Sequence, residues 1–294
     1  MVRVMMQLVA DAQLVIDQPG SDRDEDLHQV RLVIKRLRSY LRLFKPVMEE
    51  AIVFRLNRRL RAAARRLSAL RDTSVAQRML EAWVRRVRRP PQRRALQAVL
   101  ETLARQLTHA HPMGSGREAV LRRVGAELQA IGAELASHRL SAEGWDALQP
   151  GLNQTYRRGR RGMRRSLKSN QDEDYHEWRK HTKDLYYHLQ LLEGAWPDSI
   201  RKTGRRLASL QDMIGLDHDL TVVSGLLRED PVFRKDADLM RVRKGMAAEN
   251  RKLRKRIEKK GRNLFDESSR KFTRRLRKHW ARWREDGGRE PAHE

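Results

Sequence analysis

Two short segments carry residues whose types and spacing could do chemistry. In each, histidine, arginine and lysine occupy the first, fourth and eighth positions of a short run. These residues are His28, Arg31 and Lys35 in the first segment and His176, Arg179 and Lys183 in the second. At about 100° per residue of an α-helix, such positions project from one side. Arginine offers a planar fork of donors and lysine a compact charge, so the repeated stripe could hold phosphate groups at set intervals.

Each cationic stripe is opposed by an apolar one. Arg38 and Arg42 extend the first stripe, Val30 and Leu37 project from the other side of that helix, and Lys180 flanks the second stripe. In a basic protein such a helix can also simply turn its charges to solvent. The same spacing in both segments favours a binding face, and two such helices facing one another would line one basic channel.

The two segments belong to a longer internal repeat. Residues 24–31 are echoed by residues 172–179 at an offset of 148, and nine of the 21 positions between residues 24 and 44 are identical without a gap. Further on the register drops by one, where residues 72–75 fall on residues 219–222. The chain therefore contains two diverged copies of one helical unit.

The pattern of apolar residues predicts an all-α fold. Apolar residues recur at helical spacing almost everywhere, and alternating strand-like runs are absent. We expect one domain over residues 1–285, with copies at about 1–140 and 141–285, and a disordered tail at 286–294. Roughly ten helices are expected by ordinary length priors. Their boundaries should lie at residues 19–20, 46, 90–91, 112–116, 144, 150–151, 196–197 and 230–231.

The charge balance points to a negatively charged partner. Lysine and arginine number 64 against 38 aspartates and glutamates, which gives a formal net charge of +26, while 39% hydrophobic residues suffice for a core. So much like charge destabilises a compact state unless a polyanion is a normal partner.

No catalytic constellation is present, and we expect a protein that is not an enzyme. Cysteine is absent, as are a P-loop, a Gly-x-Ser-x-Gly elbow and a His-Glu-x-x-His pair. No cofactor or metal is predicted, because His176, His181 and His188 do not share one helical face. The acids near expected helix junctions, interpreted as caps or ion-pair partners, are Asp72, Asp212, Asp217 and Asp219.

His28 and His176 have two interpretations. A lone histidine near a helix start is commonly a hydrogen-bonded structural residue. Cations close by lower its pKa and a bound polyanion raises it, so each histidine could also be a neutral donor or a pH-sensitive contact.

The sequence also predicts the compartment. No run approaches the roughly 18 apolar residues of a membrane span. Residues 1–16 interrupt their apolar residues with polar ones and lack the pattern of a secretory signal. We expect a cytoplasmic protein without membrane association, and the sequence specifies no oligomeric state.

Further basic clusters could contribute to the same surface, or could be solvated. They lie in the run 157–165 and around Arg66 and Arg206, whereas the charged run 251–260 is expected to be a merely solvated helix. The complete set predicted to bind the polyanion is His28, Arg31, Lys35, Arg36, Arg38, Arg42, Arg59, Arg66, Arg71, Arg157, Arg158, Arg160, Arg161, Arg164, His176, Arg179, Lys180, Lys183, Arg205 and Arg206.

Together these residues resemble the CHAD family, the "conserved histidine α-helical domain". The family pattern His-x-x-Arg-x-x-x-Lys/Arg-Arg-Leu-Arg is similar to residues 28–38. The later Arg-Asp signature resembles residues 71–75, the Tyr-Arg-Arg-Gly-Arg-Arg start of the second half resembles residues 156–161, and Leu-Gln-Asp to Asp-Leu resembles residues 210–220. The resemblance covers about residues 1–285.

The resemblance implies two pseudo-symmetric helical bundles related by a pseudo-twofold axis, a central basic surface carrying the histidines, and binding of inorganic polyphosphate. Asp184 and Tyr186 depart from the family pattern, because they occupy the positions that match Arg36 and Arg38. The departure weakens the second stripe. Nothing here corresponds to the triphosphate-processing domain fused to some members.

Inorganic polyphosphate is therefore the predicted partner, and the protein could accompany polyphosphate granules. Non-specific nucleic-acid binding is the alternative, since phosphate contacts dominate affinity there too. Aromatic residues are only 5% of the chain, which leaves few rings for base stacking. An enzyme acting on phosphorylated substrates is the third alternative.

Overall fold

A computed structural model describes residues 2–18, 20, 22–68, 72–110, 115–192 and 198–286. These residues form twelve α-helices and one short 3-10 helix, and they contain no strand. The all-α prediction is confirmed. None of the helices in these ranges is long and apolar enough to cross a membrane.

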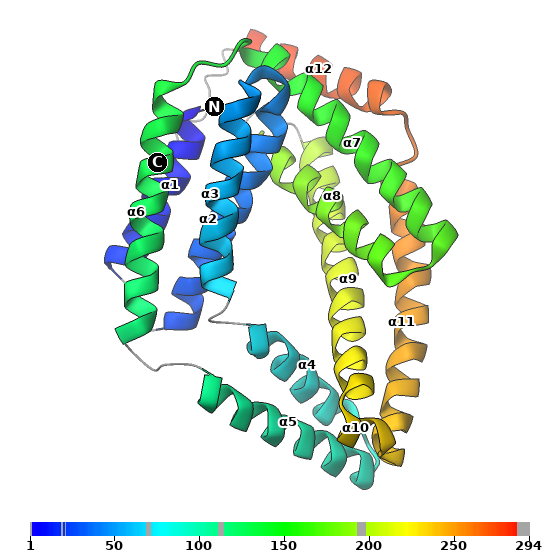
Figure 1. Cartoon of the computed structure of the whole chain (residues 1–294). Helices are drawn as coiled ribbons and strands as arrows, with labels where there is room; N and C mark the ends of the chain where they lie inside the picture. Colours follow the sequence, from blue (N-terminus) through cyan, green and yellow to red (C-terminus); the bar gives the residue numbers. More distant parts are fainter. Residues whose placement is uncertain are drawn as a thin grey trace.

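Four helices form the first bundle. They are α1 (Val2–Asp17), α2 (Arg23–Phe44), α3 (Glu50–Ser68) and α6 (Ser115–Ser137). Helix α1 packs on α2 and α6, and α3 packs on α2 and α6, so the four close into a ring of contacts (Figure 1). Helix α1 has Met5, Leu8 and Ala12 in the core and is an ordinary member of this bundle.

The second bundle repeats this order of contacts. It contains α7 (Gly144–Ser169), α8 (Asp172–Gln190), α9 (Asp198–Glu229) and α11 (Ala237–Leu264). Helix α8 packs on α7 and α9, and α11 packs on α9 and α7. The short α10 (Pro231–Lys235) joins α9 to α11, and α12 (Ser269–Glu285) covers α7. Two copies of one helical unit are expected to pack in this similar way. The duplication itself remains a hypothesis drawn from the sequence.

A pair of helices from the first half reaches the second bundle. Helix α4 (Asp72–Arg86) and helix α5 (Pro90–Ala110) pack on one another, α4 packs on α9, and α5 packs on α11. In Figure 1 this pair crosses the bottom of the molecule. The two halves of the chain therefore share packing surfaces instead of folding apart.

Most of the described helix boundaries agree with the local sequence signals. Asp22 caps α2 by accepting from the Asp24 and Glu25 amides at 2.9 and 3.1 Å. Pro46 lies in the 3-10 helix η1 (Lys45–Val47) that ends α2. Pro90 begins α5 and Pro231 begins α10. Residues 111–114 and 193–197, and the tail beyond Asp286, lie outside the described residues.

The boundary expected at residues 150–151 is wrong. Helix α7 runs through Pro150 without ending. A Cβ at Gly151 would lie 1.9 Å from the Leu43 carbonyl oxygen, so glycine lets α7 cross the end of α2 in backbone contact. Packing at this crossing outweighs the loss of one helical hydrogen bond at proline.

Polar contacts fasten α2 to α8, and with them the two bundles. Arg42 Nε donates to Asp184 Oδ2 at 2.7 Å, and a second guanidinium nitrogen contacts the other carboxylate oxygen. The buried Ser39 hydroxyl donates to the Asp184 carbonyl, and His188 Nε2 lies 2.9 Å from the Ser39 carbonyl. Burial lowers the pKa of His188 to about 4, so the neutral ring donates its N–H to this carbonyl.

The Arg42–Asp184 pair should be a coupled stabilising unit. The Asp184 side chain is 11% exposed and that of Arg42 is 36% exposed. Arg42→Met leaves the buried Asp184 carboxylate without its ion-pair partner, so we expect it to lower the free energy of unfolding by about 2–3 kcal/mol. Asp184→Leu should cost less, because Arg42 can turn to solvent. Urea unfolding of both variants and of the double variant measures the coupling, and strictly additive losses would contradict a direct pair.

Candidate anion-binding surface

Five cations gather along the contacts of α2 with α3 and α8, and we name them the basic seam. They are Lys35, Arg38 and Arg42 on α2 and Arg179 and Lys183 on α8. Burial and the nearby charges of Lys35 and Arg179 lower the pKa of Lys183 to about 7. Lys35 and Lys183, which match one another in the repeat, therefore repel across the contact between the motif helices. The seam holds a lysine in a place where its charged form is costly.

The positive charge of Lys183 is balanced only in part by nearby carboxylates. Asp184 and Asp212 raise the pKa of Lys183, but less than burial and its cationic neighbours lower it. Asp184 is already engaged by Arg42. The Lys183 ammonium also lies 5.6 Å from the centroid of the Tyr187 ring, a modest cation–π contact. A bound anion would supply the missing balance.

Two arginines of the first stripe turn toward α3. Arg31 Nη1 donates to the Leu67 carbonyl at 3.0 Å, in the last turn of α3. Arg38 Nε donates to the Asn57 side-chain oxygen at 3.0 Å. Burial and the charges of Arg42 and Arg61 lower the pKa of Arg38. Arg31 therefore helps to cap α3, whereas Arg38 keeps unbalanced positive charge within the seam.

The second motif histidine lies against a histidine of α9. The ring centroids of His176 and His218 are 4.7 Å apart. Burial, then His218, lowers the pKa of His176, and burial, then Arg179, lowers the pKa of His218. Both rings are thus largely neutral near pH 7. Over the described ranges, no three histidines or carboxylates converge into a metal site.

Helix α7 brings one more predicted arginine close to this region. Burial lowers the pKa of His181, the charges of Arg158 and Arg42 lower it further, and Asp184 raises it. Arg157 and Arg161 are exposed on α7. Arg158 is exposed as well, but its charge acts on His181, so it is the residue of the 157–165 run that lies close to α8.

Several predicted residues lie apart from the seam. Arg59 pairs with Glu127 at 2.7 Å and Glu134 at 2.8 Å, in the packing of α3 on α6. Arg160 donates to the Phe265 carbonyl at 3.2 Å. With Arg164, it lines a separate cavity of about 430 Å³. These arginines support the fold or form a second basic cluster.

The remaining predicted residues differ in surroundings. Arg36 lies on the flank of α2, where it opposes the increase that burial causes in the pKa of Tyr40 and Tyr187. Lys180 contacts Glu177 on its own helix. His28 is half-buried on α2, and Arg66, Arg205 and Arg206 are exposed on α3 and α9. Arg71 lies outside the described residues.

Sequence reasoning missed three residues of this region. Asp184 was interpreted as a defect in the second stripe, yet it is the counter-ion that joins the bundles. His218 and Arg61 were not singled out. His218 directly precedes the segment 219–222 that matches residues 72–75, and the sequence gives no other signal for its contact with α8.

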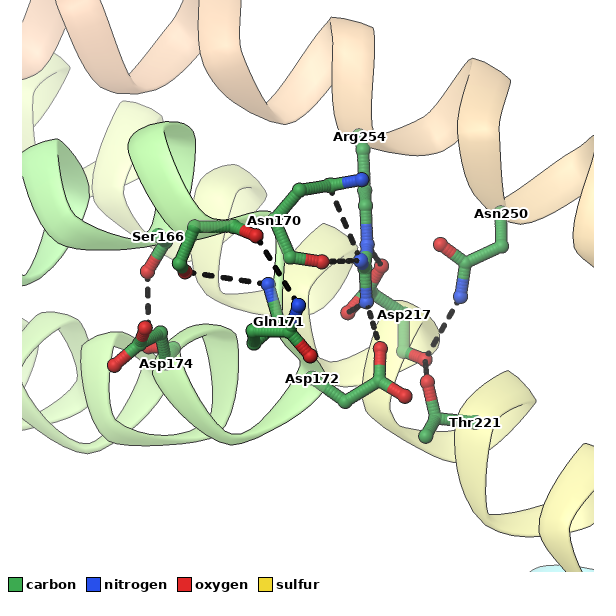
Figure 2. A network of polar contacts seen from close by, with 10 residues as sticks. Ser166, Asn170, Gln171, Asp172, Asp174, Asp217, Thr221, Asn250 and Arg254 are labelled. Atoms are coloured by element: carbon green, nitrogen blue, oxygen red, sulfur yellow. Dashed lines mark hydrogen bonds and ion pairs between the residues drawn. The ribbon is translucent and has the colours of Figure 1, made fainter.

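The interpretation of the run 251–260 as merely solvated is wrong at Arg254. Its side chain is 12% exposed and donates to Asp217 at 2.7 Å and to the Asn170 carbonyl at 2.8 Å (Figure 2). It also pairs with Asp172 and lies 4.2 Å from the Tyr175 ring centroid. The predicted ion-pair role of Asp217 is confirmed, although Asp217 lies inside α9 and not at a helix junction.

Lys183 should lower the stability of the unliganded protein. Its pKa is about 7 in the fold. The ordinary lysine pKa is about 10.4. Below pH 7 Lys183 is charged in both states, and the free energy of unfolding is lowered by the full cost of burying this charge. This cost decreases as the pH rises toward about 10.4, the pKa of lysine in the unfolded chain.

We therefore expect Lys183→Met to raise the midpoint of thermal unfolding. The gain should be larger at pH 6.5 than at pH 9.5, and a change of 1 kcal/mol corresponds to about 2–4 °C in a chain of this size. Thermal melts at both pH values check this. A variant less stable than wild type at pH 6.5 would show that the seam is internally balanced.

The chain matches a model of one known protein family. A family model described as "CHAD domain" matches residues 6–228, which is more than half of the chain and includes both motif helices. A search of curated proteins gives no match. The chain belongs to the CHAD domain family.

Proposed function

We propose that this protein binds inorganic polyphosphate through the basic seam, without catalysing its breakdown. The observation that carries the proposal is the cluster of Lys35, Arg179 and Lys183, in which burial and mutual repulsion lower the pKa of Lys183 to about 7. Strongly shifted groups gather at functional sites more often than elsewhere. Membership of the CHAD domain family is consistent with this ligand.

The distribution of the cations favours an extended anion. The seam runs from Arg38, beside Arg61 of α3, to Arg179, beside His218 of α9. A compact anion such as orthophosphate would engage only part of such a row. A chain of linked phosphates offers oxygens to each cation in turn, with charge-assisted hydrogen bonds at each.

Nucleic acid is the competing ligand, and the seam favours it less. Tyr40 and Tyr187, the aromatic rings near Arg36, are 4% and 3% exposed and are unable to stack on bases. Recognition there would rest on phosphates alone. By the same proposal the protein resides in the cytoplasm and accompanies polyphosphate deposits.

Binding of long-chain polyphosphate should depend on the seam more than on net charge. Lys35, Arg179 and Lys183 are changed together to glutamine in one variant. The control changes the exposed Lys252, Arg256 and Lys259 of α11 in the same way. Three charge-assisted contacts at about 1 kcal/mol or more each predict a loss on the order of 100-fold in the seam variant.

Titration by fluorescence anisotropy at several salt concentrations measures these affinities. Wild-type affinity should fall steeply with salt, because counterions are displaced from the polyanion. Equal losses of affinity in the two folded variants would reject the seam as the binding site. Tighter binding of duplex DNA at equal phosphate concentration would reject polyphosphate as the ligand. Orthophosphate released from polyphosphate during incubation would replace the proposal with a polyphosphate-processing enzyme.

Binding should be accompanied by proton uptake near neutral pH. An anion stabilises the charged form of Lys183 and raises its pKa from about 7. His176 and His218, whose pKa values are also lowered, would follow at lower pH. The affinity for polyphosphate should therefore decrease as pH rises from 6 to 9.

Calorimetry in two buffers of different ionisation enthalpy measures the protons taken up. Lys183→Arg keeps the charge but does not titrate in this range, so this variant should bind with less proton uptake at pH 7.5. Unchanged uptake in the arginine variant would exclude Lys183 as the titrating contact.

A further inference from the structure

Another cavity lies in the second bundle. It has a volume of about 660 Å³ and is formed by α9, α11 and the turn between α7 and α8. None of the five seam cations lines it. A cavity of this size is within the range of small-molecule sites, roughly 300–1,000 Å³.

Short side chains leave this space open. Thr221, Ser224 and Gly225 on α9 face Ala247 on α11 across the cavity. Gly225 has no close neighbour at its missing Cβ except the far end of Glu229, 3.8 Å away. The opening therefore follows from the sequence of the two helices.

Part of the cavity lining is held by a network of polar contacts. Arg254 joins Asp217 of α9, Asp172 of α8 and the Asn170 carbonyl at the end of α7 (Figure 2). The Asn250 amide donates to the Asp217 carbonyl at 3.4 Å, next to this network. These contacts join α7, α8, α9 and α11 around the site, so its polar groups are positioned before any ligand arrives.

The lining of the cavity also includes three exposed cations. Arg251 and Lys255 are exposed on α11, and within the described residues neither has an ion-pair partner. Arg228 of α9 also lines the cavity, and among the described residues its ion-pair partner is the exposed Glu229, at 3.6 Å. The carboxylates of the lining are already engaged, Asp172 by Arg254 and Glu258 by Arg262. The free charge of the cavity is therefore positive.

We propose that this cavity binds a small molecule with a diphosphate group, held by Arg228, Arg251 and Lys255. Three cations from two helices suit an anion with more than one phosphate. The Ser224 hydroxyl lines the wall and can bond further ligand oxygens. The lining ring of Tyr175 is 3% exposed beneath Arg254, so recognition rests on the phosphates and not on base stacking.

The site is independent of the proposed polyphosphate surface and is tested separately. Calorimetry on the full chain uses inorganic pyrophosphate, ADP and orthophosphate as probes. Arg251→Gln combined with Lys255→Gln should weaken diphosphate binding at least tenfold. Lys252→Gln combined with Lys259→Gln removes the same charge from the same helix outside the cavity and should change it less than twofold.

A second pair of variants fills the space without changing charge. Gly225→Leu should block the cavity, whereas Gly204→Leu, on the same helix where a Cβ meets no atom within 4 Å, should leave binding intact. Thermal melts first establish that all four variants are folded. Long-chain polyphosphate should still bind the cavity variants with wild-type affinity.

The outcomes separate the two proposals. Binding of pyrophosphate alone or of ADP alone, lost in both cavity variants, supports the site and identifies an inorganic or a nucleotide source. The site is rejected if neither diphosphate binds, if orthophosphate binds as tightly, if Gly225→Leu binds normally, or if binding is instead lost on changing Lys35 and Lys183. In that last case polyphosphate binding at the seam would still stand.

Discussion

Electrostatic repulsion at the contact between α2 and α8 is the constraint on which the arrangement of this protein depends. Lys35, Arg179 and Lys183 are held together there, at a place where burial already disfavours a charged lysine. The apolar sides of the same helices hold them there, since Leu37 of α2 and Trp178 of α8 are fully buried. Burying these large side chains offsets the cost of crowding the cations on the opposite face.

Carboxylates and carbonyls separate structural arginines from those available to a ligand. Arg42 and Arg254 each hold a buried aspartate, and the pairs join helices that the chain order keeps apart. Arg31 and Arg160 donate to carbonyls at or near helix ends, where backbone acceptors lack helical partners. The net charge of +26 therefore does not form one uniform binding surface, because several of the arginines are engaged in ion pairs and hydrogen bonds within the fold.

Three consecutive residues of α9 connect these different roles. Asp217 faces Arg254 of α11, His218 lies against His176 of α8, and Asp219 is close enough to Arg179 for that charge to lower its pKa against the effect of burial. Successive helical positions point about 100° apart, so one turn of helix serves three neighbours. The same turn supports the basic seam on one side and the end of the second cavity on another.

Helical periodicity and charge spacing are local properties of the chain, so the all-α class, the motif helices and the cationic stripe were predictable from the sequence alone. The sequence also indicated Asp217 as an ion-pair partner. The packing of distant helices determines which cations are engaged by carboxylates. In sequence, Arg59 and Arg254 resemble the exposed Lys252, and only the approach of α6 or α9 brings the carboxylates that engage them. Likewise Pro150 signals a helix end, but the crossing of α7 over α2 at Gly151 keeps the helix intact. The sequence lacks this information because a charge pair or a close crossing depends on distances between residues far apart in the chain, as in the 142 residues between Arg42 and Asp184.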